Sequence, residues 1–148
     1  MIVIDSSVAT KLIFAEEHSG LAESLLADNI ARGESAVGPP LLPIEFTNVV
    51  RQRMRREGLS YDEAVSALDR FFSQPIAIHQ GSDSSRQSLH RRALALAATF
   101  DLPAAYDAHY LALAESVNCA FWTADERLLR GLAGRFPLAR SLTDYAPN

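Results

Sequence analysis

The sequence predicts an α/β fold in which helices cover both faces of a mostly parallel sheet. Short apolar runs of only a few residues alternate along the chain with longer amphipathic segments. Such alternation is typical of strand–helix–strand units, whose strands are parallel. The chain of 148 residues contains no internal repeat and no long Gly/Ser linker, so we expect residues 1–148 to form one domain.

The first half of the chain begins with a strand and continues mainly as helices. Ile2-Val-Ile4 is a β-branched apolar run that ends at polar Asp5, as expected of a buried strand. Ser35-Ala-Val-Gly38 is a second short strand, stopped by two prolines. Gly58 is a helix stop, and Ser60-Tyr-Asp-Glu63 is a capping box that begins the next helix. Helices are therefore predicted at 7–15, 18–31, 42–58 and 60–72.

The second half alternates more regularly. Pro75-Ile-Ala-Ile78 and Cys119-Ala-Phe-Trp122 have the length and composition of strands, and residues 138–142 are a candidate fifth strand. Thr123-Ala-Asp-Glu126 matches a capping box, which would make Thr123 an N-cap and Asp125 a first-turn acid. Helices are predicted at 84–100, 104–117 and 125–132.

The composition is that of a globular protein without disulfides or membrane spans. Hydrophobic residues make up 48% and charged residues 22% of the chain, which is ordinary for a folded domain. Apolar stretches are far shorter than the ~20 residues that cross a bilayer, and the first residues lack the basic segment of a signal peptide. The single cysteine, Cys119, excludes an internal disulfide and a cysteine-based zinc site. We therefore expect a cytoplasmic protein with no membrane contact.

The charge balance argues against a protein that coats nucleic acid. The net charge is −4, so bulk electrostatic attraction to phosphate is not expected. Of the 14 basic residues, however, Lys11 is the only lysine, and arginine is the better bidentate phosphate binder. A local basic surface beside a local acidic site is compatible with this composition.

Two of four candidate acidic residues lie where an open α/β sheet binds ligands, at the carboxyl ends of strands. Asp5 directly follows the first strand, Asp125 follows the fourth, and Glu45 and Asp107 lie near helix starts. Carboxylates that gather in one place repel one another, and a divalent cation relieves this repulsion. Since all the ligands would be oxygens, Mg²⁺ or Mn²⁺ is favoured over zinc. Taken singly, each acid is better explained without a function, as a helix cap, a first-turn acid or a solvated side chain.

Four motifs surround these acids and occur in order along the chain. They are Val3-Ile-Asp5-Ser-Ser7, Pro43-Ile-Glu45-Phe-Thr-Asn48-Val-Val, Tyr106-Asp107-Ala-His-Tyr-Leu-Ala-Leu-Ala-Glu115 and Phe121-Trp-Thr123-Ala-Asp125-Glu-Arg-Leu. Each motif is weakly specific, but together they resemble the PIN-domain ribonucleases, and within them the VapC-like toxins of type II toxin–antitoxin systems. The resemblance covers essentially the whole chain. It implies a three-layer α/β/α sandwich with a central parallel sheet of four to five strands.

The resemblance also implies an activity and a partner. These are Mg²⁺- or Mn²⁺-dependent endoribonuclease cleavage of RNA and restraint of that cleavage by a cognate antitoxin protein. Asp5 and Asp107 resemble the principal metal ligands, and Glu45 and Asp125 resemble the supporting acids. The four acids together are the candidate catalytic residues.

Three polar residues resemble supporting members of the same site. Ser6 and Thr123 match small hydroxyl residues that would hydrogen-bond a carboxylate or the scissile phosphate. Asn48 follows Glu45 by three residues, so both project from one helix face.

Further residues leave two interpretations open. Arg51, Arg53, Arg55 and Arg56 either interact with the dipole at the end of their helix or contact RNA or the antitoxin. The aromatic residues Tyr61, Phe71 and Phe72 belong either to the core or to the interface of an expected homodimer.

Two alternative functions are weighed against the ribonuclease. One is a Mg²⁺-dependent DNA nuclease or phosphatase, although haloacid-dehalogenase phosphatases have a second aspartate two residues after the first, where this chain has Ser7. The other is a catalytically silent RNA-binding module of PIN-like fold, which the four intact acids disfavour.

Overall fold

A five-stranded, all-parallel sheet forms the centre of the computed structural model, which describes residues 1–147 apart from the side chain of residue 83. The strand order is β3-β2-β1-β4-β5. Every neighbouring pair is parallel. The predicted parallel sheet of four to five strands is thus confirmed. The strands are β1 Ile2–Ile4, β2 Ala36–Gly38, β3 Ile76–Ile78, β4 Ala120–Thr123 and β5 Ala139–Ser141.

Seven α-helices connect and cover these strands in the described part of the chain, and each begins and ends within two residues of its predicted range. A short 3₁₀ helix, Leu142–Asp144, follows β5. Among the described residues, none of the helices is both long enough and apolar enough to span a bilayer. The helices are α1 Ser6–Ile13, α2 Ser19–Ala31, α3 Leu42–Glu57, α4 Tyr61–Phe72, α5 Asp83–Thr99, α6 Tyr106–Val117 and α7 Glu126–Leu132.

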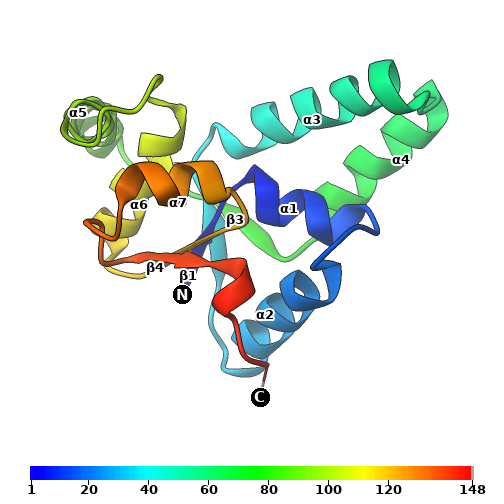
Figure 1. Cartoon of the computed structure of the whole chain (residues 1–148), viewed down its shortest axis with the longest axis horizontal. Coiled ribbons are helices and arrows are strands. Elements are labelled where there is room, and N and C mark those ends of the chain that lie inside the picture. Colours follow the sequence, from blue (N-terminus) through cyan, green and yellow to red (C-terminus); the bar gives the residue numbers. More distant parts are fainter. Residues whose placement is uncertain (148) are drawn as a thin grey trace.

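Helices pack on both faces of the sheet, because alternate strand residues point to opposite sides. In β1, Val3 belongs to the larger hydrophobic cluster, with Leu111 of α6. Its neighbours Ile2 and Ile4 belong to a second cluster, with Leu25 of α2. The arrangement is the three-layer sandwich expected from the sequence, with α2 on one side and α6 on the other (Figure 1).

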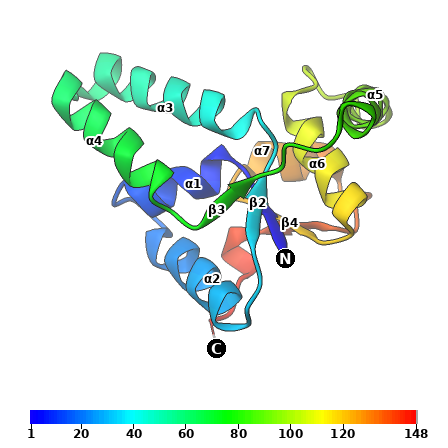
Figure 2. The same cartoon turned by 180° about the vertical axis from the view of Figure 1, so that it is seen from behind.

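Helices α3 and α4 form an antiparallel hairpin that extends away from the sheet, as both views show (Figures 1 and 2). Gly58 ends α3 with a φ of 76°, which suits glycine, and the predicted capping box of Ser60 and Glu63 begins α4. Phe71 is buried in the core, whereas Tyr61 and Phe72 are exposed on α4. Core burial therefore explains only one of the three aromatic residues.

The end of β2 lies very close to the start of α3. A Cβ atom at Gly38 would lie 2.4 Å from Cδ2 of the fully buried Leu42. Only glycine fits this approach without displacing the leucine. The contact lies where α3 leaves the sheet, three residues before Glu45 in the first turn of that helix.

Candidate active site

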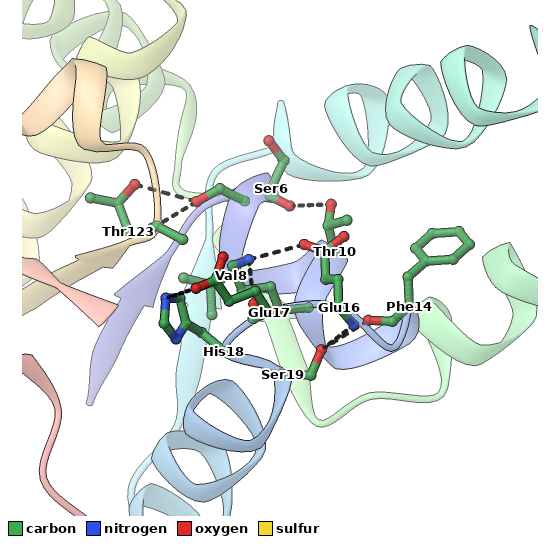
Figure 3. A network of polar contacts seen from close by, with 12 residues as sticks. Ser6, Val8, Thr10, Phe14, Glu16, Glu17, His18, Ser19 and Thr123 are labelled. Atoms are coloured by element: carbon green, nitrogen blue, oxygen red, sulfur yellow. Dashed lines mark hydrogen bonds and ion pairs between the residues drawn. The ribbon is translucent and has the colours of Figure 1, made fainter. Parts of the chain in front are cut away.

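Asp5 lies at the carboxyl end of β1, where parallel α/β sheets bind ligands. Ile4 pairs with Trp122 of β4, so the following residues, Asp5 and Thr123, are neighbours across the sheet. The Thr123 hydroxyl donates a 2.5 Å hydrogen bond to Oδ2 of Asp5. Figure 3 shows Thr123 at the end of its strand, facing the start of α1. Two adjacent strands therefore supply this part of the site.

The other oxygen of the Asp5 carboxylate caps α1. Oδ1 accepts hydrogen bonds from the backbone N–H groups of Ser7 and Val8, at 3.0 and 3.1 Å, and from the Ser7 hydroxyl at 2.5 Å. Helix capping does not require burial, yet Asp5 is only 7% exposed. A carboxylate so far from water is costly unless a cation compensates its charge.

Burial raises the pKa of the Asp5 carboxyl from 3.8 to about 6. The hydrogen bonds from Ser7, Thr123 and Val8 oppose this increase, and the negative charge of Asp107 adds to it. The direction follows from desolvation, which penalises the charged form of an acid. Asp5 is therefore oriented by several donors but is not neutralised by them.

Asp125 is the N-cap of α7, and one residue, Ala124, separates it from β4. Its Oδ1 accepts hydrogen bonds from the backbone N–H groups of Arg127 and Leu128, at 2.8 and 3.0 Å. The prediction that Thr123 caps this helix is wrong, because Thr123 is the last residue of β4. Its hydroxyl oxygen instead accepts the Asp125 N–H at 2.9 Å while it donates to Asp5.

Glu45 lies in the first turn of α3 and is held by a tyrosine that the sequence analysis did not identify. Tyr110, on α6, is 1% exposed, and its Oη donates a 2.5 Å hydrogen bond to Oε2 of Glu45. Burial raises the pKa of Glu45, the Tyr110 hydrogen bond lowers it, and the charges of Asp107 and Asp5 raise it again. The pKa of Tyr110 is also raised, first by burial and then by Glu45, so its hydroxyl stays a donor.

Asp107, in the first turn of α6, links the four acids electrostatically. Its pKa is raised by burial and then by the charge of Asp125, while Arg127 lowers it. The charge of Asp107 in turn raises the pKa values of Asp5 and Glu45. The charge of Asp107 thus interacts with those of the other three acids, and the charge of Asp5 also interacts with that of Glu45.

The remaining predicted polar residues are distributed unevenly around this group. Ser6 is half-buried, and its hydroxyl lowers the pKa of Glu45 through a hydrogen bond. Ser7, not Ser6, is the serine that donates to Asp5, and it also accepts the backbone N–H of Ala124 at 2.8 Å. Asn48 is exposed on α3.

Ser7 and Tyr110 therefore contact the acids although the sequence analysis did not select them. A signal existed for each. Ser7 lies at the helix position whose N–H faces the side chain of a capping aspartate, here Asp5. Tyr110 follows Asp107 by three residues and so shares its helix face.

The arginines at the end of α3 divide into two groups. Arg53 forms ion pairs with Glu16 and Glu57, and its guanidinium lies 4.3 Å above the centre of the Phe14 ring. These contacts tie α3 to the end of α1, which is a structural role. Arg51, Arg55 and Arg56 are exposed.

The donor chemistry of the site fits a divalent cation. In the described part of the chain, no lysine or arginine forms an ion pair with any of the four carboxylates. No three of the described His, Cys, Asp and Glu side chains are close enough together to bind one ion. This is compatible with Mg²⁺, which is commonly held by one or two carboxylates together with water and substrate phosphates.

The fold and the site define a class: a parallel α/β/α sandwich with coupled carboxylates at the carboxyl ends of its central strands. A model of the PIN-domain family matches residues 2–133. The match covers most of the chain, which therefore belongs to the PIN-domain family. PIN domains are in general nucleases that use divalent metal ions.

A solved structure and a set of curated proteins were compared with the chain as well. The crystal structure of PAE2754 from Pyrobaculum aerophilum is similar, with a TM-score of 0.65 over 96% of this chain and 89% of that chain. The two sequences are 19% identical, so this similarity concerns the fold. The comparison with curated proteins gave no match.

Proposed function

We propose that this protein is a Mg²⁺- or Mn²⁺-dependent endoribonuclease that acts in the cytoplasm as the toxin of a toxin–antitoxin pair. The environment of Asp5 is the observation that supports metal-dependent nuclease activity. This carboxylate is buried, lies within the electrostatic influence of Asp107, and has no ion-pair partner among the described residues. RNA as the substrate and the role as a toxin rest on the resemblance of the four motifs to VapC-like toxins. The family supports nuclease chemistry in general.

Asp5 and Asp107 would hold the cation, because they resemble the principal metal ligands of the family and because the charge of Asp107 acts on Asp5 at the end of β1. A divalent cation there would supply charge neutralisation at the phosphodiester and lower the pKa of water. Ser7 and Thr123 keep the Asp5 carboxylate in one orientation. Ligand carboxylates are commonly oriented by such outer hydrogen bonds.

Glu45 would take a proton from the attacking water. Its raised pKa brings its proton affinity closer to neutral pH, where a general base works most efficiently. Tyr110 occupies Oε2, so the proton would be accepted on Oε1. Asp125, whose charge raises the pKa of Asp107, would also support the cation.

The antitoxin would cover exposed apolar side chains on the α3–α4 hairpin and place a basic residue among the acids. In support, Tyr61 is 73%, Phe72 65% and Ile44 66% exposed, so three large apolar side chains of this hairpin are open to a partner. A short amphipathic segment suits such a surface and would fold only on binding. Added Mg²⁺ should weaken this inhibition in part, because cation and basic side chain compete for the same carboxylates.

A growth assay tests the toxin role. Expression of this chain alone should arrest growth, and co-expression of the neighbouring gene should restore it. Asp5→Asn should be harmless without rescue, and Asp62→Asn, which changes an exposed aspartate on α4, should remain toxic. A well-expressed, folded wild-type chain that does not affect growth would refute the toxin role.

Arg51, Arg55 and Arg56 are proposed to contact RNA phosphates. They are exposed, and no ion pair engages them among the described residues. Each lost phosphate contact should reduce the slope of log affinity against log salt by about 0.7–0.9. An unchanged slope in the triple glutamine variant would show that these arginines do not contact RNA, and would favour interaction with the dipole of α3 or contact with the antitoxin.

Purified protein tests the substrate and the alternatives. It should cleave RNA, leave single-stranded and duplex DNA intact, and release no phosphate from phosphomonoesters. Cleavage of DNA or a phosphomonoester instead would favour the DNA nuclease or the phosphatase. RNA binding without cleavage in Mn²⁺ would favour the silent module. Sedimentation at equilibrium should give the mass of the proposed homodimer.

A further inference from the structure

Two histidines join α5 to α6, helices that lie side by side (Figure 2). Nδ1 of His90, on α5, lies 2.8 Å from Nε2 of His109, on α6. The ring centres are 4.9 Å apart and the ring planes meet at 73°, so the rings approach through their nitrogen atoms and do not stack. The function proposed above gives neither histidine a role.

The backbone carbonyl of Ala105 determines which nitrogen of His109 carries a hydrogen. Nδ1 of His109 lies 2.6 Å from this oxygen. Because a carbonyl only accepts hydrogen bonds, Nδ1 is the donor, and in the neutral ring Nε2 keeps a lone pair. That lone pair faces His90. Histidines that bind metal ions are commonly oriented in this way, with the second ring nitrogen donating to a carbonyl.

The spacing of the two nitrogens suits a single metal ion. Nitrogens that bind one ion at 2.0–2.1 Å lie about 2.9–3.4 Å apart, depending on the angle between them. The observed 2.8 Å needs only a small opening. His90 is exposed, so its ring can turn while the half-buried His109 stays in place. The tautomer of His90 with its hydrogen on Nε2 presents a second lone pair, at Nδ1, to the ion.

We infer that His90 and His109 bind a divalent transition-metal ion such as Ni²⁺, Cu²⁺ or Zn²⁺, at a site separate from the four acids. Imidazole nitrogen favours these ions, whereas Mg²⁺ prefers oxygen. No third His, Cys, Asp or Glu among the described residues is close enough to join the pair, so water would fill the other positions. The ion would tie α5 to α6, the helix that carries Asp107. The inference does not rest on the proposed nuclease function.

Electron paramagnetic resonance of added Cu²⁺ tests the site in the full chain. Excess Mg²⁺ in the buffer occupies the carboxylates, and the spectrum separates nitrogen from oxygen ligands. The wild type should show nitrogen coordination. Because two fixed ligands act as a chelate, His90→Asn or His109→Asn should weaken Cu²⁺ binding by on the order of 100-fold. His79 lines the same cavity but is not part of the pair, so His79→Asn is the matched control and should bind like the wild type.

Thermal unfolding with Ni²⁺ reports whether binding stabilises the fold. Ni²⁺ should raise the Tm of the wild type and of His79→Asn, because an ion that binds only the folded state stabilises it. It should raise the Tm of His90→Asn much less. The same difference should persist when Asp5→Asn is present in both proteins, since the proposed site does not use that carboxylate. Mg²⁺ should not distinguish the wild type from His90→Asn.

Three results would overturn the inference. The first is Cu²⁺ bound to the wild type through oxygen ligands only, or bound equally by His90→Asn. The second is a loss of nitrogen coordination in His90→Asn but not in a folded His109→Asn protein, which would show that one histidine binds the ion alone. The third is a Ni²⁺ effect that disappears with Asp5→Asn, which would assign the ion to the carboxylates.

Discussion

Replacing Asp5 by asparagine should stabilise the metal-free protein at neutral pH, although it removes a proposed catalytic residue. Asparagine has the same shape, is an equally good N-cap, and can accept the backbone hydrogen bonds of Ser7 and Val8. What the substitution removes is a buried negative charge. It also disturbs the hydrogen bond from Thr123, which now faces an amide.

The magnitude follows from the pKa of Asp5, which rises from 3.8 in the unfolded chain to about 6 in the fold. Between these values the folded state holds a proton that the unfolded state has lost, so stability falls as pH increases from about 4 to about 6. At 1.36 kcal/mol for each tenfold change in proton affinity, the wild type loses about 3 kcal/mol over this range. Asp5→Asn avoids this loss but gives up about 1 kcal/mol for the Thr123 hydrogen bond.

Urea denaturation in EDTA, from pH 4 to pH 7.5, measures the difference between the two proteins. At pH 4, the free energy of unfolding of Asp5→Asn should equal that of the wild type or be slightly smaller. At pH 7 it should be larger by about 2 kcal/mol, which corresponds to roughly 4–8 °C in Tm. Asp62→Asn is the control and should show no pH-dependent difference. Added Mn²⁺ should then stabilise the wild type more than the variant, because ligand binding favours the folded state.

Two outcomes would contradict this reasoning. If Asp5→Asn is less stable than the wild type by the same amount at every pH, the carboxylate serves only as a helix cap. If Mn²⁺ also stabilises both proteins equally, Asp5 is not a ligand.

Three further substitutions test other parts of the structure. Gly38→Ala should destabilise the protein by about 1–3 kcal/mol in urea denaturation, because its Cβ would overlap the first residue of α3, whereas Gly20→Ala, with nothing within 4 Å, should be neutral or stabilising. Tyr110→Phe should reduce kcat and shift the acidic limb of the pH–rate profile to higher pH, because the Tyr110 hydrogen bond lowers the pKa of Glu45 and its removal should raise that pKa. An unchanged profile would contradict this role of Tyr110. Arg53→Gln should cost about 1 kcal/mol of stability and leave RNA affinity unchanged, and a loss of affinity would count against its structural role.

Local signals in the sequence were sufficient to predict the elements of the fold. The Ser60–Glu63 capping box and the Gly58 stop depend on neighbouring residues only, and both lie where expected. The short strands also followed from local apolar runs. The capping box at Thr123 failed because Asp125, two residues later, is the N-cap of α7, whereas Thr123 ends β4 and its hydroxyl contacts Asp5.

The candidate site was predictable as a set of acids but not as an arrangement. Asp5 could be located because strand ends are where parallel sheets bind ligands. The contact between Tyr110 and Glu45 spans 65 positions in the sequence and depends on how α3 and α6 pack. No local pattern encodes such a contact.

Similar reasoning applies to charged and aromatic side chains that looked alike in the sequence. Arg53 resembled its exposed neighbours, yet Glu16, 37 positions away, engages it. Phe71 and Phe72 are adjacent, but only Phe71 faces the core, where it stacks on Phe46 with ring centres 4.3 Å apart. The difference is set by the rotation of α4 about its axis, which tertiary packing decides.

Cleavage of RNA by the purified protein, followed in EDTA and after addition of Mg²⁺ or Mn²⁺, tests the central claim most directly. The carboxylate site predicts no cleavage in EDTA, recovery with either ion, and a loss of several orders of magnitude in Asp107→Asn, whose thermal unfolding should remain cooperative. Undiminished cleavage in chelator, or near-normal cleavage by a folded Asp107→Asn protein, would contradict the account.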